Sequence, residues 1–288
     1  MQLTSLVAAA LLAQSASVSA GNLRFACSQL VVDRVDPLVD PGVVYSPHLH
    51  QIVGGNAFNA TMHPENDPAK QSTCTSCSFA QDFSNYWTAV MFYKAKNGTY
   101  KRVPQVANGG PEGLLTQNGG ITVYYLYGAS KSRTAFKKGF RMLAGDAANT
   151  NPAKVAPANL CHRCWTNPVI DNSIANFVGG SPCADPKDTV EIPTSPDCKY
   201  IRQTVIFPSC WDGKNLDSPD HKSHVAYIRG ADKVLRGGTC PPEFPVQVSQ
   251  IMLEIMWDLR QFTERSADSF VYSMNNGYVS FSKWYGLC

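Results

Sequence analysis

The segment IMLEIMWDLR, residues 251–260, decides the fold class of this chain. Its apolar side chains recur at every second position, at Ile251, Leu253, Ile255, Trp257 and Leu259. A period of two places these side chains on one face of a β-strand, whereas an amphipathic helix needs a spacing of three to four residues. Met, Leu and Glu are good helix formers, so a helix is the alternative. The alternation favours a strand.

Other short runs of β-branched and aromatic residues precede this segment, and turn-forming Gly, Pro, Asn or Asp residues separate them. Strands are expected at residues 30–32, 43–45, 86–94, 99–103, 121–127, 202–207 and 225–228. The dipeptide Asn97-Gly98 lies between two of these runs. Because it is the commonest sequence of a type I′ turn, it predicts a tight hairpin.

The composition is that of a folded, turn-rich protein. Of the 288 residues 44% are hydrophobic and 16% are charged, and 19 Pro and 21 Gly occur without a period. These values exclude disorder and a collagen-like repeat. The formal net charge is only +3 and no cluster of Lys and Arg is present, so nucleic acid is not expected as a partner.

These features predict a single domain over residues 21–288. Its expected class is all-β: a disulfide-stabilised antiparallel β-sandwich or jelly-roll-like domain with long loops. The Pro-rich and cysteine-bearing residues 151–196 are expected to form a long excursion held by disulfides.

The first 20 residues have the features of a signal peptide. An apolar run over residues 6–12 is followed by small and polar residues that end in Val18-Ser19-Ala20, a pattern typical of a cleavage site. The run is far shorter than the ~20 residues of a membrane-spanning helix, so no membrane span is expected. The chain is therefore predicted to be secreted, and the sequons at Asn59 and Asn97 are candidate glycosylation sites.

All ten cysteines follow the predicted cleavage site, and their number is even. In a secreted protein this predicts structural disulfides, each stabilising the fold by about 2 to 4 kcal/mol. The alternative is a zinc ribbon, because Cys74/Cys77 and Cys161/Cys164 have the required CxxC spacing. The pairing of the cysteines stays open at this point.

Four of the six histidines occur in two close pairs, His48/His50 and His221/His224. On a strand, positions 48 and 50 point to the same face, so their imidazoles could bind one metal ion or line one pocket. No acidic third ligand follows within residues 51–55. The alternative is that these rings are hydrogen-bonded to loop backbone or exposed.

Three acids, Asp212, Asp217 and Asp220, lie between Trp211 and the second histidine pair. A carboxylate at such a place could orient a histidine, act as a general base or form half of the acid pair of a glycosidase. The alternative is that these aspartates form turns, which Asp-Gly and Ser-Pro-Asp sequences commonly do.

The segment DFSNYW, residues 82–87, combines a carboxylate and an amide with two aromatic rings. An aromatic ring gives a sugar a flat apolar platform, and a neighbouring carboxylate can bind its hydroxyl groups. Asp82 and Tyr86 are therefore candidate binding residues. Trp87 lies on an expected strand, where packing in the core is the favoured role.

Several blocks occur in a fixed order along the chain. They are HLH at residues 48–50, GGN at 54–56, STC at 72–74, DFSNYW at 82–87, FRMLAGD at 140–146 and FPSCWDGKNLDSPDHKSHVAY at 207–227. This ordered set resembles domain of unknown function 1996, a family of secreted fungal and actinobacterial proteins, some of which carry a WSC module that binds cell-wall sugars. The resemblance covers nearly all of residues 21–288. It implies one convergent polar pocket, but it names no reaction.

Two features of this chain depart from that family pattern. Phe244 stands where the family usually has a histidine, and the segment around Lys283 lacks the histidine and aspartate usual in the family. These departures favour binding over catalysis for this chain.

Three functions are compatible with these residues. The first is a carbohydrate-active enzyme, a hydrolase or lyase acting on cell-wall or plant polysaccharide. Its candidate catalytic residues are His50, Asp82, Asp220, His221 and His224. Its candidate substrate-binding residues are His48, Tyr86, Trp211, Asp212 and Asp217.

The second function is non-catalytic binding of a glycan or cell wall through the same residues. The third is binding of a divalent metal ion, and no other cofactor is expected. The candidate metal ligands are His48, His50, His221 and His224.

Overall fold

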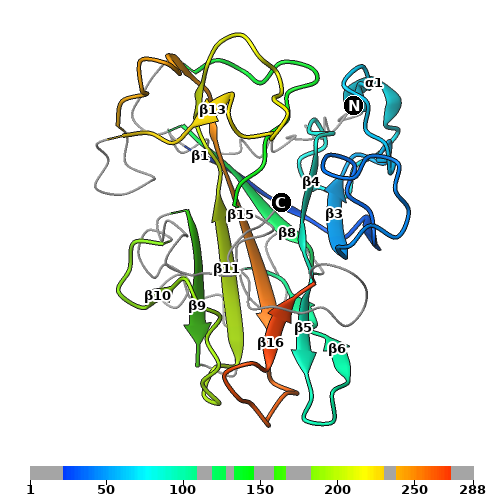
Figure 1. Cartoon of the computed structure of the whole chain (residues 1–288), viewed down its shortest axis with the longest axis vertical. Helices are drawn as coiled ribbons and strands as arrows, with labels where there is room; N and C mark the ends of the chain where they lie inside the picture. Colours follow the sequence, from blue (N-terminus) through cyan, green and yellow to red (C-terminus); the bar gives the residue numbers. More distant parts are fainter. Residues whose placement is uncertain are drawn as a thin grey trace, which may run out of the picture.

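A computed structural model describes residues 22–108, 119–127, 133–145, 159–166, 183–229 and 238–273. In these residues the chain forms antiparallel sheets, with one short helix, α1 (Pro68–Gln71). Figure 1 shows the long strands running side by side through the body of the molecule, with loops gathered at one end. The predicted all-β, disulfide-stabilised class is confirmed.

The largest sheet holds seven strands and is built around the segment with the period-two pattern. Its strands, in spatial order, are β1 (Asn22–Cys27), β8 (Ile121–Leu126), β15 (Gln250–Asp258), β11 (Tyr200–Ile206), β9 (Leu160–Trp165) and β10 (Asp188–Thr189), and β7 (Gln105–Val106) also pairs with β15. Strand β15 therefore lies near the centre, between β8 and β11.

Three smaller sheets of three strands each complete the described fold. They are β2 (Val31–Asp33), β3 (His50–Gly54) and β4 (Asn85–Ala89); β16 (Phe270–Tyr272), β5 (Met91–Lys94) and β6 (Tyr100–Arg102); and β13 (Val225–Ala226), β12 (Cys210–Trp211) and β14 (Val246–Gln247).

The main core lies on the face of β15 predicted from the sequence. Leu253, Ile255 and Trp257 pack there with buried residues of the smaller sheets, such as Met91 of β5 and Phe270 of β16. The opposite face of β15 is also buried and holds two methionines and a glutamate. The sheet is thus covered on both sides, which explains why eight of the nine residues of β15 are buried and six are apolar.

Four disulfides join the described cysteines. The pairs are Cys27–Cys77, Cys161–Cys183, Cys164–Cys198 and Cys210–Cys240. The two cysteines of a CxxC motif are not bonded to each other in either case. Three of the four cysteines in the two motifs form disulfides with cysteines elsewhere in the chain. The zinc-ribbon alternative is therefore wrong. Among the described residues Cys74 is a free and exposed thiol.

Residues 43–45 were expected to form a strand, and this expectation is wrong. Val43, Val44 and Tyr45 lie in a turn and are among the most exposed large apolar residues described. Tyr45 has a φ of 72°, which a strand does not allow. These residues follow the turn at Pro41-Gly42, and no strand in the described part of the chain pairs with them.

The expected strand at residues 86–94 is interrupted at Val90, and its two halves, β4 and β5, belong to different sheets. The hairpin after it is present, because β5 pairs with β6. Its turn differs from the predicted type, however. Only Gly98 has a positive φ, whereas a type I′ turn needs positive φ at both central residues.

The described part of residues 151–196 also differs from the expectation of an excursion. Strand β9 lies within it and pairs with β11 in the central sheet. Two disulfides attach this strand to later parts of the chain, at Cys183 and Cys198.

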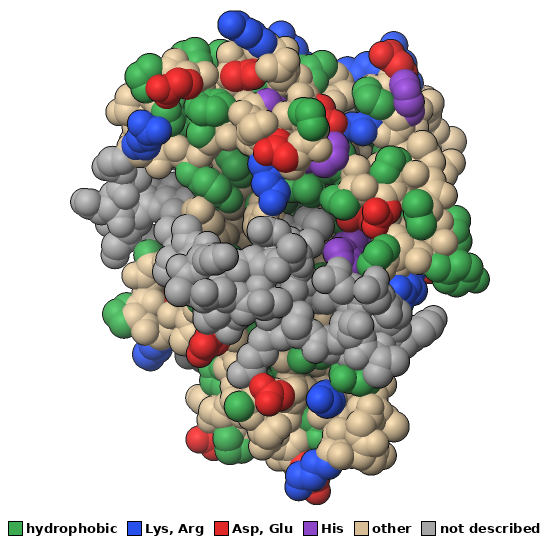
Figure 2. Space-filling view, viewed as in Figure 1, with side chains coloured by type: hydrophobic (Ala, Val, Ile, Leu, Met, Phe, Trp, Pro, Cys, Tyr) green, Lys and Arg blue, Asp and Glu red, His purple; other side chains and the backbone are tan. Residues whose placement is uncertain are grey.

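The described surface carries charges of both signs. Figure 2 shows Lys and Arg side chains interspersed with Asp and Glu on one face, without a region of a single sign. Asn59 and Asn97 of the two sequons are exposed. Within the described ranges, no helix has the length and apolar character that crossing a membrane requires.

Candidate functional site

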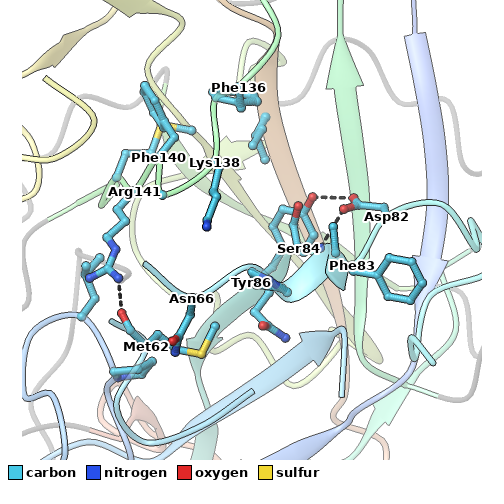
Figure 3. Close-up of a pocket in the computed structure, with 18 of the residues that line it drawn as sticks. Met62, Asn66, Asp82, Phe83, Ser84, Tyr86, Phe136, Lys138, Phe140 and Arg141 are labelled. Atoms are coloured by element: carbon cyan, nitrogen blue, oxygen red, sulfur yellow. Dashed lines mark hydrogen bonds between the residues drawn. The ribbon is translucent and has the colours of Figure 1, made fainter. Parts of the chain in front are cut away.

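A cavity of about 470 Å³ lies between the central sheet and four further segments of the chain. Its volume is within the range typical of small-molecule sites. The lining comes from residues 37–38, 62–69, 81–87 and 136–143, with Tyr125, Phe207, Ile251 and Leu253 at the sheet. Figure 3 shows these groups surrounding an open centre.

A carboxylate and two phenols form a hydrogen-bonded cluster in the lining. The Tyr86 hydroxyl donates to Asp82 Oδ2 at 2.6 Å and lies 2.5 Å from the Tyr125 hydroxyl. Asp82 Oδ1 accepts the backbone N–H of Ser84 at 2.9 Å. Asp82 is thereby held in place by residues of two elements, because Tyr86 lies on β4 and Tyr125 on β8.

Both phenols remain protonated at neutral pH. Burial raises the pKa of Tyr86 well above its ordinary value, and the neighbouring Tyr125 and Asp82 raise it further. Burial and the Asp82 charge likewise raise the pKa of Tyr125. The two tyrosines therefore act as hydrogen-bond donors around a carboxylate and not as bases.

The opposite side of the cavity carries positive charge. Figure 3 shows Lys138 pointing into the open centre from the loop that also holds Arg141, across from Asp82. Lys138 Nζ lies 3.9 Å from Asp67 Oδ2, and Arg141 donates to the carbonyl oxygen of Met62. The Arg141 contact joins two walls of the cavity.

Aromatic and other apolar side chains make up much of the remaining lining. Phe83, Phe136, Phe140 and Trp87 are among them. Phe136 and Phe140 have ring centroids 5.1 Å apart. Trp87 is only half-buried and packs beside Leu38 and Leu143, so it lines the cavity as well as packing.

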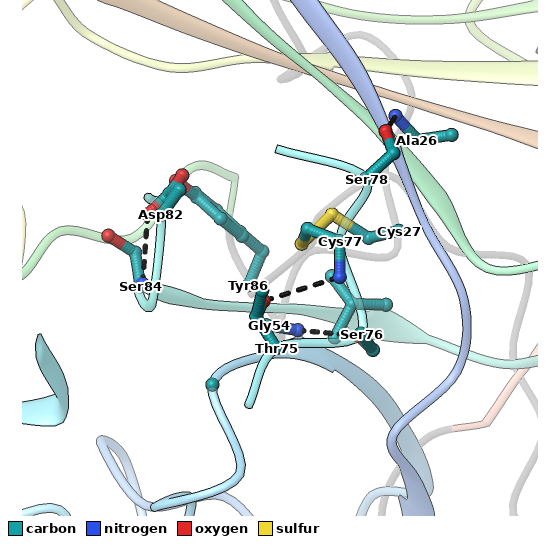
Figure 4. The surroundings of a disulfide bond; sticks show 12 residues. Ala26, Cys27, Gly54, Thr75, Ser76, Cys77, Ser78, Asp82, Ser84 and Tyr86 are labelled. Atoms are coloured by element: carbon teal, nitrogen blue, oxygen red, sulfur yellow. Dashed lines mark hydrogen bonds between the residues drawn. A yellow bond between two sulfur atoms is a disulfide. The ribbon is translucent and has the colours of Figure 1, made fainter. Parts of the chain in front are cut away.

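The Cys27–Cys77 disulfide fixes the base of the loop that carries Asp82. Figure 4 shows how close this bond lies to β3 and to the start of β4. Ser76 Oγ accepts the backbone N–H of Gly54 at 2.9 Å. Gly54 has a φ of 113°, and a Cβ there would lie 1.9 Å from the carbonyl oxygen of Ser84. Only glycine permits this close approach of β3 to the Asp82 loop.

The predicted block at residues 207–227 lies directly behind the cavity wall formed by residues 140–143. Three hydrogen bonds join the two segments. The backbone N–H of Arg141 donates to the Leu216 carbonyl, and the backbone N–H of Leu143 donates to the His221 carbonyl. In addition, His224 Nε2 donates to the Arg141 carbonyl. The block therefore supports the wall from behind.

His224 has both ring nitrogens engaged. Nε2 donates to the Arg141 carbonyl at 2.7 Å, and Nδ1 lies 2.8 Å from the hydroxyl oxygen of Ser218, which in turn donates to Asp220 Oδ1. The ring is 1% exposed. Contacts at both ring nitrogens hold the buried ring in one orientation.

Asp220 and Asp212 form turns. Asp220 Oδ1 accepts the backbone N–H groups of Lys222 and Ser223, and these bonds lower the pKa of Asp220. Burial would raise the pKa of Asp212, but hydrogen bonds from the backbone of Lys214 and Asn215 lower it.

Trp211 is buried, and its Nε1 donates to the Asn215 carbonyl oxygen at 2.6 Å. Its ring packs edge-on against Phe140, which lines the cavity. Trp211 thus lies behind the lining, in contact with Phe140 and with the ammonium group of Lys137, which is 5.0 Å from the centre of its ring.

Of the candidate residues in this block, His221 and Asp217 most resemble a catalytic histidine–aspartate pair. His221 Nδ1 lies 2.6 Å from Asp217 Oδ1, and both side chains are partly exposed. A histidine oriented in this way presents Nε2 as a possible base. Neither residue belongs to the described lining of the cavity, but Arg141 does. Burial lowers the pKa of Arg141, and the Asp217 charge opposes this shift.

His48 and His50 lie next to Asp36, outside the described lining of the cavity. One ligand atom from each of the three residues falls within 4.8 Å of the other two, and all three residues are buried. Burial lowers the pKa of His50, while the neighbouring Asp36 opposes this shift. Pro37 and Leu38, which follow Asp36, line the cavity. This cluster is the one that could hold a metal ion in the described part of the chain.

Of the candidate site residues predicted from the sequence, only Asp82 and Tyr86 belong to the described lining of the cavity. The sequence reasoning missed Tyr125, Lys138 and Arg141. Tyr125 lies in an expected strand and Lys138 belongs to no motif. Arg141 lies in the FRMLAGD block at residues 140–146, which supports the family resemblance but carries no site signal of its own.

The comparisons with known proteins give a family and no activity. A family model described as domain of unknown function (DUF1996) matches residues 36–285. No curated protein and no solved structure shows a significant match. The matched range includes the cavity and all three motifs.

Proposed function

The chain belongs to the DUF1996 family, and on that premise we propose that it is an extracellular protein that binds a cell-wall or plant polysaccharide in this cavity. The observation that carries the proposal is the cluster of Asp82, Tyr86 and Tyr125 at the side of an aromatic cavity of about 470 Å³. The four disulfides are compatible with an extracellular location.

The chemistry of the lining fits a sugar in two ways. A fixed carboxylate accepts hydrogen bonds from hydroxyl groups, and hydrogen bonds to a charged group are stronger than those between neutral groups. Phe83, Phe136 and Phe140 are among the lining residues, and aromatic rings pack favourably against the C–H groups of a pyranose. A cavity with only apolar lining would bind a lipid or an aromatic compound equally well.

The charges of the lining favour an acidic sugar. Lys138 is half exposed and points into the cavity opposite Asp82. A uronate could place its carboxylate near this ammonium group while its hydroxyl groups face Asp82. We therefore propose that uronate-containing polysaccharides bind more tightly than neutral glucans or chitin.

Calorimetric titration with neutral and uronate-containing oligosaccharides tests this proposal. Asp82→Asn removes the charge and keeps the shape, so loss of a charged hydrogen bond worth about 1.5 to 3 kcal/mol raises Kd roughly 10- to 100-fold. Tyr45→Phe is the matched control, because that phenol is exposed and lies outside the cavity lining. Folded protein that binds none of the oligosaccharides would contradict the proposal.

Cleavage of the bound glycan is a second candidate function. Asp67 lines the same cavity as Asp82, and glycosidases use two carboxyl groups that flank the scissile bond. Mass analysis of soluble products separates addition of water, the mark of hydrolysis, from unsaturated ends, the mark of elimination. If Asp67 takes part, Asp67→Asn abolishes product formation and leaves Kd within a few-fold of the wild-type value. Binding without products would leave binding as the function.

A further inference from the structure

A buried cluster of two histidines and one aspartate lies outside the lining of the cavity in which we propose that the glycan binds. His50 is the first residue of β3, His48 precedes it by two positions, and Asp36 lies in the loop after β2. Asp36, His48 and His50 are 0%, 7% and 1% exposed. The pairing of Asp33 with His50 in the β2–β3 ladder brings this loop over the two histidines.

The hydrogen bonds of His50 leave one ring nitrogen directed at Asp36. Nδ1 donates to the Val35 carbonyl at 2.8 Å, so Nε2 of the neutral ring carries a lone pair. Nε2 lies 3.9 Å from Asp36 Oδ2, too far for a hydrogen bond. A histidine that binds a metal through one nitrogen characteristically donates its other N–H to a backbone carbonyl or a carboxylate, as His50 does.

Asp36 is held in a similar way. Its Oδ1 accepts the backbone N–H groups of Leu38 and Val39 at 3.1 and 3.0 Å. Its Oδ2 is buried and has no hydrogen-bond partner among the described residues. A buried carboxylate oxygen without a partner is unfavourable, and here it faces a nitrogen lone pair. A cation between the two atoms satisfies both.

The other two buried histidines show that this arrangement is particular to the cluster. His162 and His224 each have both ring nitrogens within hydrogen-bond distance of a protein oxygen. His50 instead directs its second nitrogen at a carboxylate beyond hydrogen-bond range. Packing a histidine in the core does not by itself produce this geometry.

We propose that Asp36, His48 and His50 bind one divalent transition-metal ion of the Zn²⁺ type. Two imidazoles and one carboxylate form a known zinc donor set that leaves a fourth position open. Tetrahedral ligands about 2.1 Å from zinc lie about 3.4 Å apart. The 3.9 Å separation of His50 and Asp36 would close by about 0.5 Å, and the other separations, which are at most 4.8 Å, by no more than about 1.4 Å.

The surrounding charges also suit a cation. Asp40 adds a second negative charge close enough to act on His50. Nitrogen ligands disfavour Ca²⁺ and Mg²⁺, which prefer oxygen. The positive group nearest in sequence, Arg34, directs its guanidinium to the carbonyl oxygens of Ser46 and Pro47.

The bound ion would tie the loop after β2 to the start of β3. Since Pro37 and Leu38 of this loop line the carbohydrate cavity, the ion would also fix one wall of that cavity. Metal binding does not depend on the proposed glycan function, because its measurement needs no sugar.

The test uses untagged, disulfide-intact protein. Elemental analysis after purification without chelators is expected to give one metal ion per chain. Removal with EDTA is expected to lower Tm by several degrees, and added Zn²⁺ is expected to restore it, because a ligand that binds only the folded state stabilises it. Cobalt(II) provides a second readout, since its visible spectrum reports the ligand geometry.

Two variants and two controls locate the site. Asp36→Asn keeps an oxygen for the loop N–H groups and is expected to weaken Zn²⁺ binding at least tenfold, as is His50→Gln. His63→Asn, which removes an exposed histidine, and Asp40→Asn, which removes a nearby charge, are expected to retain the one-to-one stoichiometry.

Substoichiometric metal in the wild type, together with a Tm that does not respond to EDTA or Zn²⁺, would overturn the proposal. So would unchanged Zn²⁺ affinity in Asp36→Asn. These wild-type measurements remain decisive even where a variant fails to fold.

Discussion

Replacement of Glu254 with glutamine tests how much a buried network of charges contributes to stability. Glu254 lies on β15 and is 4% exposed. Its Oε2 accepts the Tyr124 hydroxyl at 2.6 Å and the Asn108 amide at 2.8 Å, and its Oε1 lies 3.5 Å from Arg202 Nε. Burial raises the pKa of Tyr124, and the Glu254 charge raises it further.

The glutamine side chain has the same shape but no charge. Of its acidic partners in the described part of the chain, Arg202 would then keep Asp188, at 3.8 Å, and it remains buried. Breaking a buried ion pair by removing one partner costs about 3 to 5 kcal/mol. The amide oxygen of glutamine still accepts the Tyr124 hydroxyl, so we expect the lower value, about 3 kcal/mol. For a domain of this size that corresponds to a fall in Tm of roughly 6 to 12 °C.

Urea unfolding at pH 7 with intact disulfides measures the effect as a change in midpoint at constant m. Asp258→Asn is the control on the same strand, because its ion pair with Arg260 is partly exposed and is expected to contribute less than about 1 kcal/mol. Adding Arg202→Met to Glu254→Gln is expected to recover part of the loss, since no uncompensated charge then remains.

Equal losses in Glu254→Gln and Asp258→Asn would refute this reasoning. The Arg202→Met single variant completes the comparison. If the double variant loses the sum of the Glu254→Gln and Arg202→Met losses, the two effects are independent, Glu254 and Arg202 are not coupled, and the reasoning is refuted.

Two further predictions concern backbone and titration. Gly54→Ala is expected to cost about 3 kcal/mol or more, because its Cβ would meet a carbonyl oxygen at 1.9 Å, whereas Gly98→Ala, whose Cβ meets nothing within 4 Å, costs about 1 kcal/mol. Thermal unfolding of both variants compares them, and similar losses would argue against the close approach. Burial lowers the pKa of His162 from 6.5 to about 4. As the pH falls, His162 takes up a proton in the unfolded chain before it does so in the folded protein. The free energy of unfolding therefore falls between pH 6.5 and pH 4, by up to about 1.4 kcal/mol per pH unit, and this loss is absent above pH 6.5. His162→Gln is expected to flatten that dependence; identical slopes for variant and wild type would show that His162 does not cause it.

The sequence predicted the strands whose pattern is local. Strands β8, β11 and β15 were found because each joins β-branched or aromatic composition to a length typical of strands. The same composition at residues 43–45 gave a wrong result. A three-residue run becomes a strand only where another strand pairs with it, and that partner is set by the tertiary fold.

The cavity could be predicted only in part for a related reason. Asp82 and Tyr86 belong to one short motif, so their proximity is visible in the sequence. Tyr125 reaches them from β8 and Lys138 faces them from a separate loop. Which distant residues complete a site depends on strand order, and no spacing in this chain specifies that order.

The block at residues 207–227 shows how a sequence motif can be specific without containing the reactive groups. The wall at residues 140–143 has no regular secondary structure, so its backbone groups need partners from elsewhere. Leu216, His221 and His224 provide these partners, and Asp220 fixes the turn between them. Each residue must have its particular side chain or backbone conformation for the wall to hold its position, including the φ of 55° at His221. A cluster of His and Asp in a sequence is therefore as consistent with building a pocket wall as with catalysis within it.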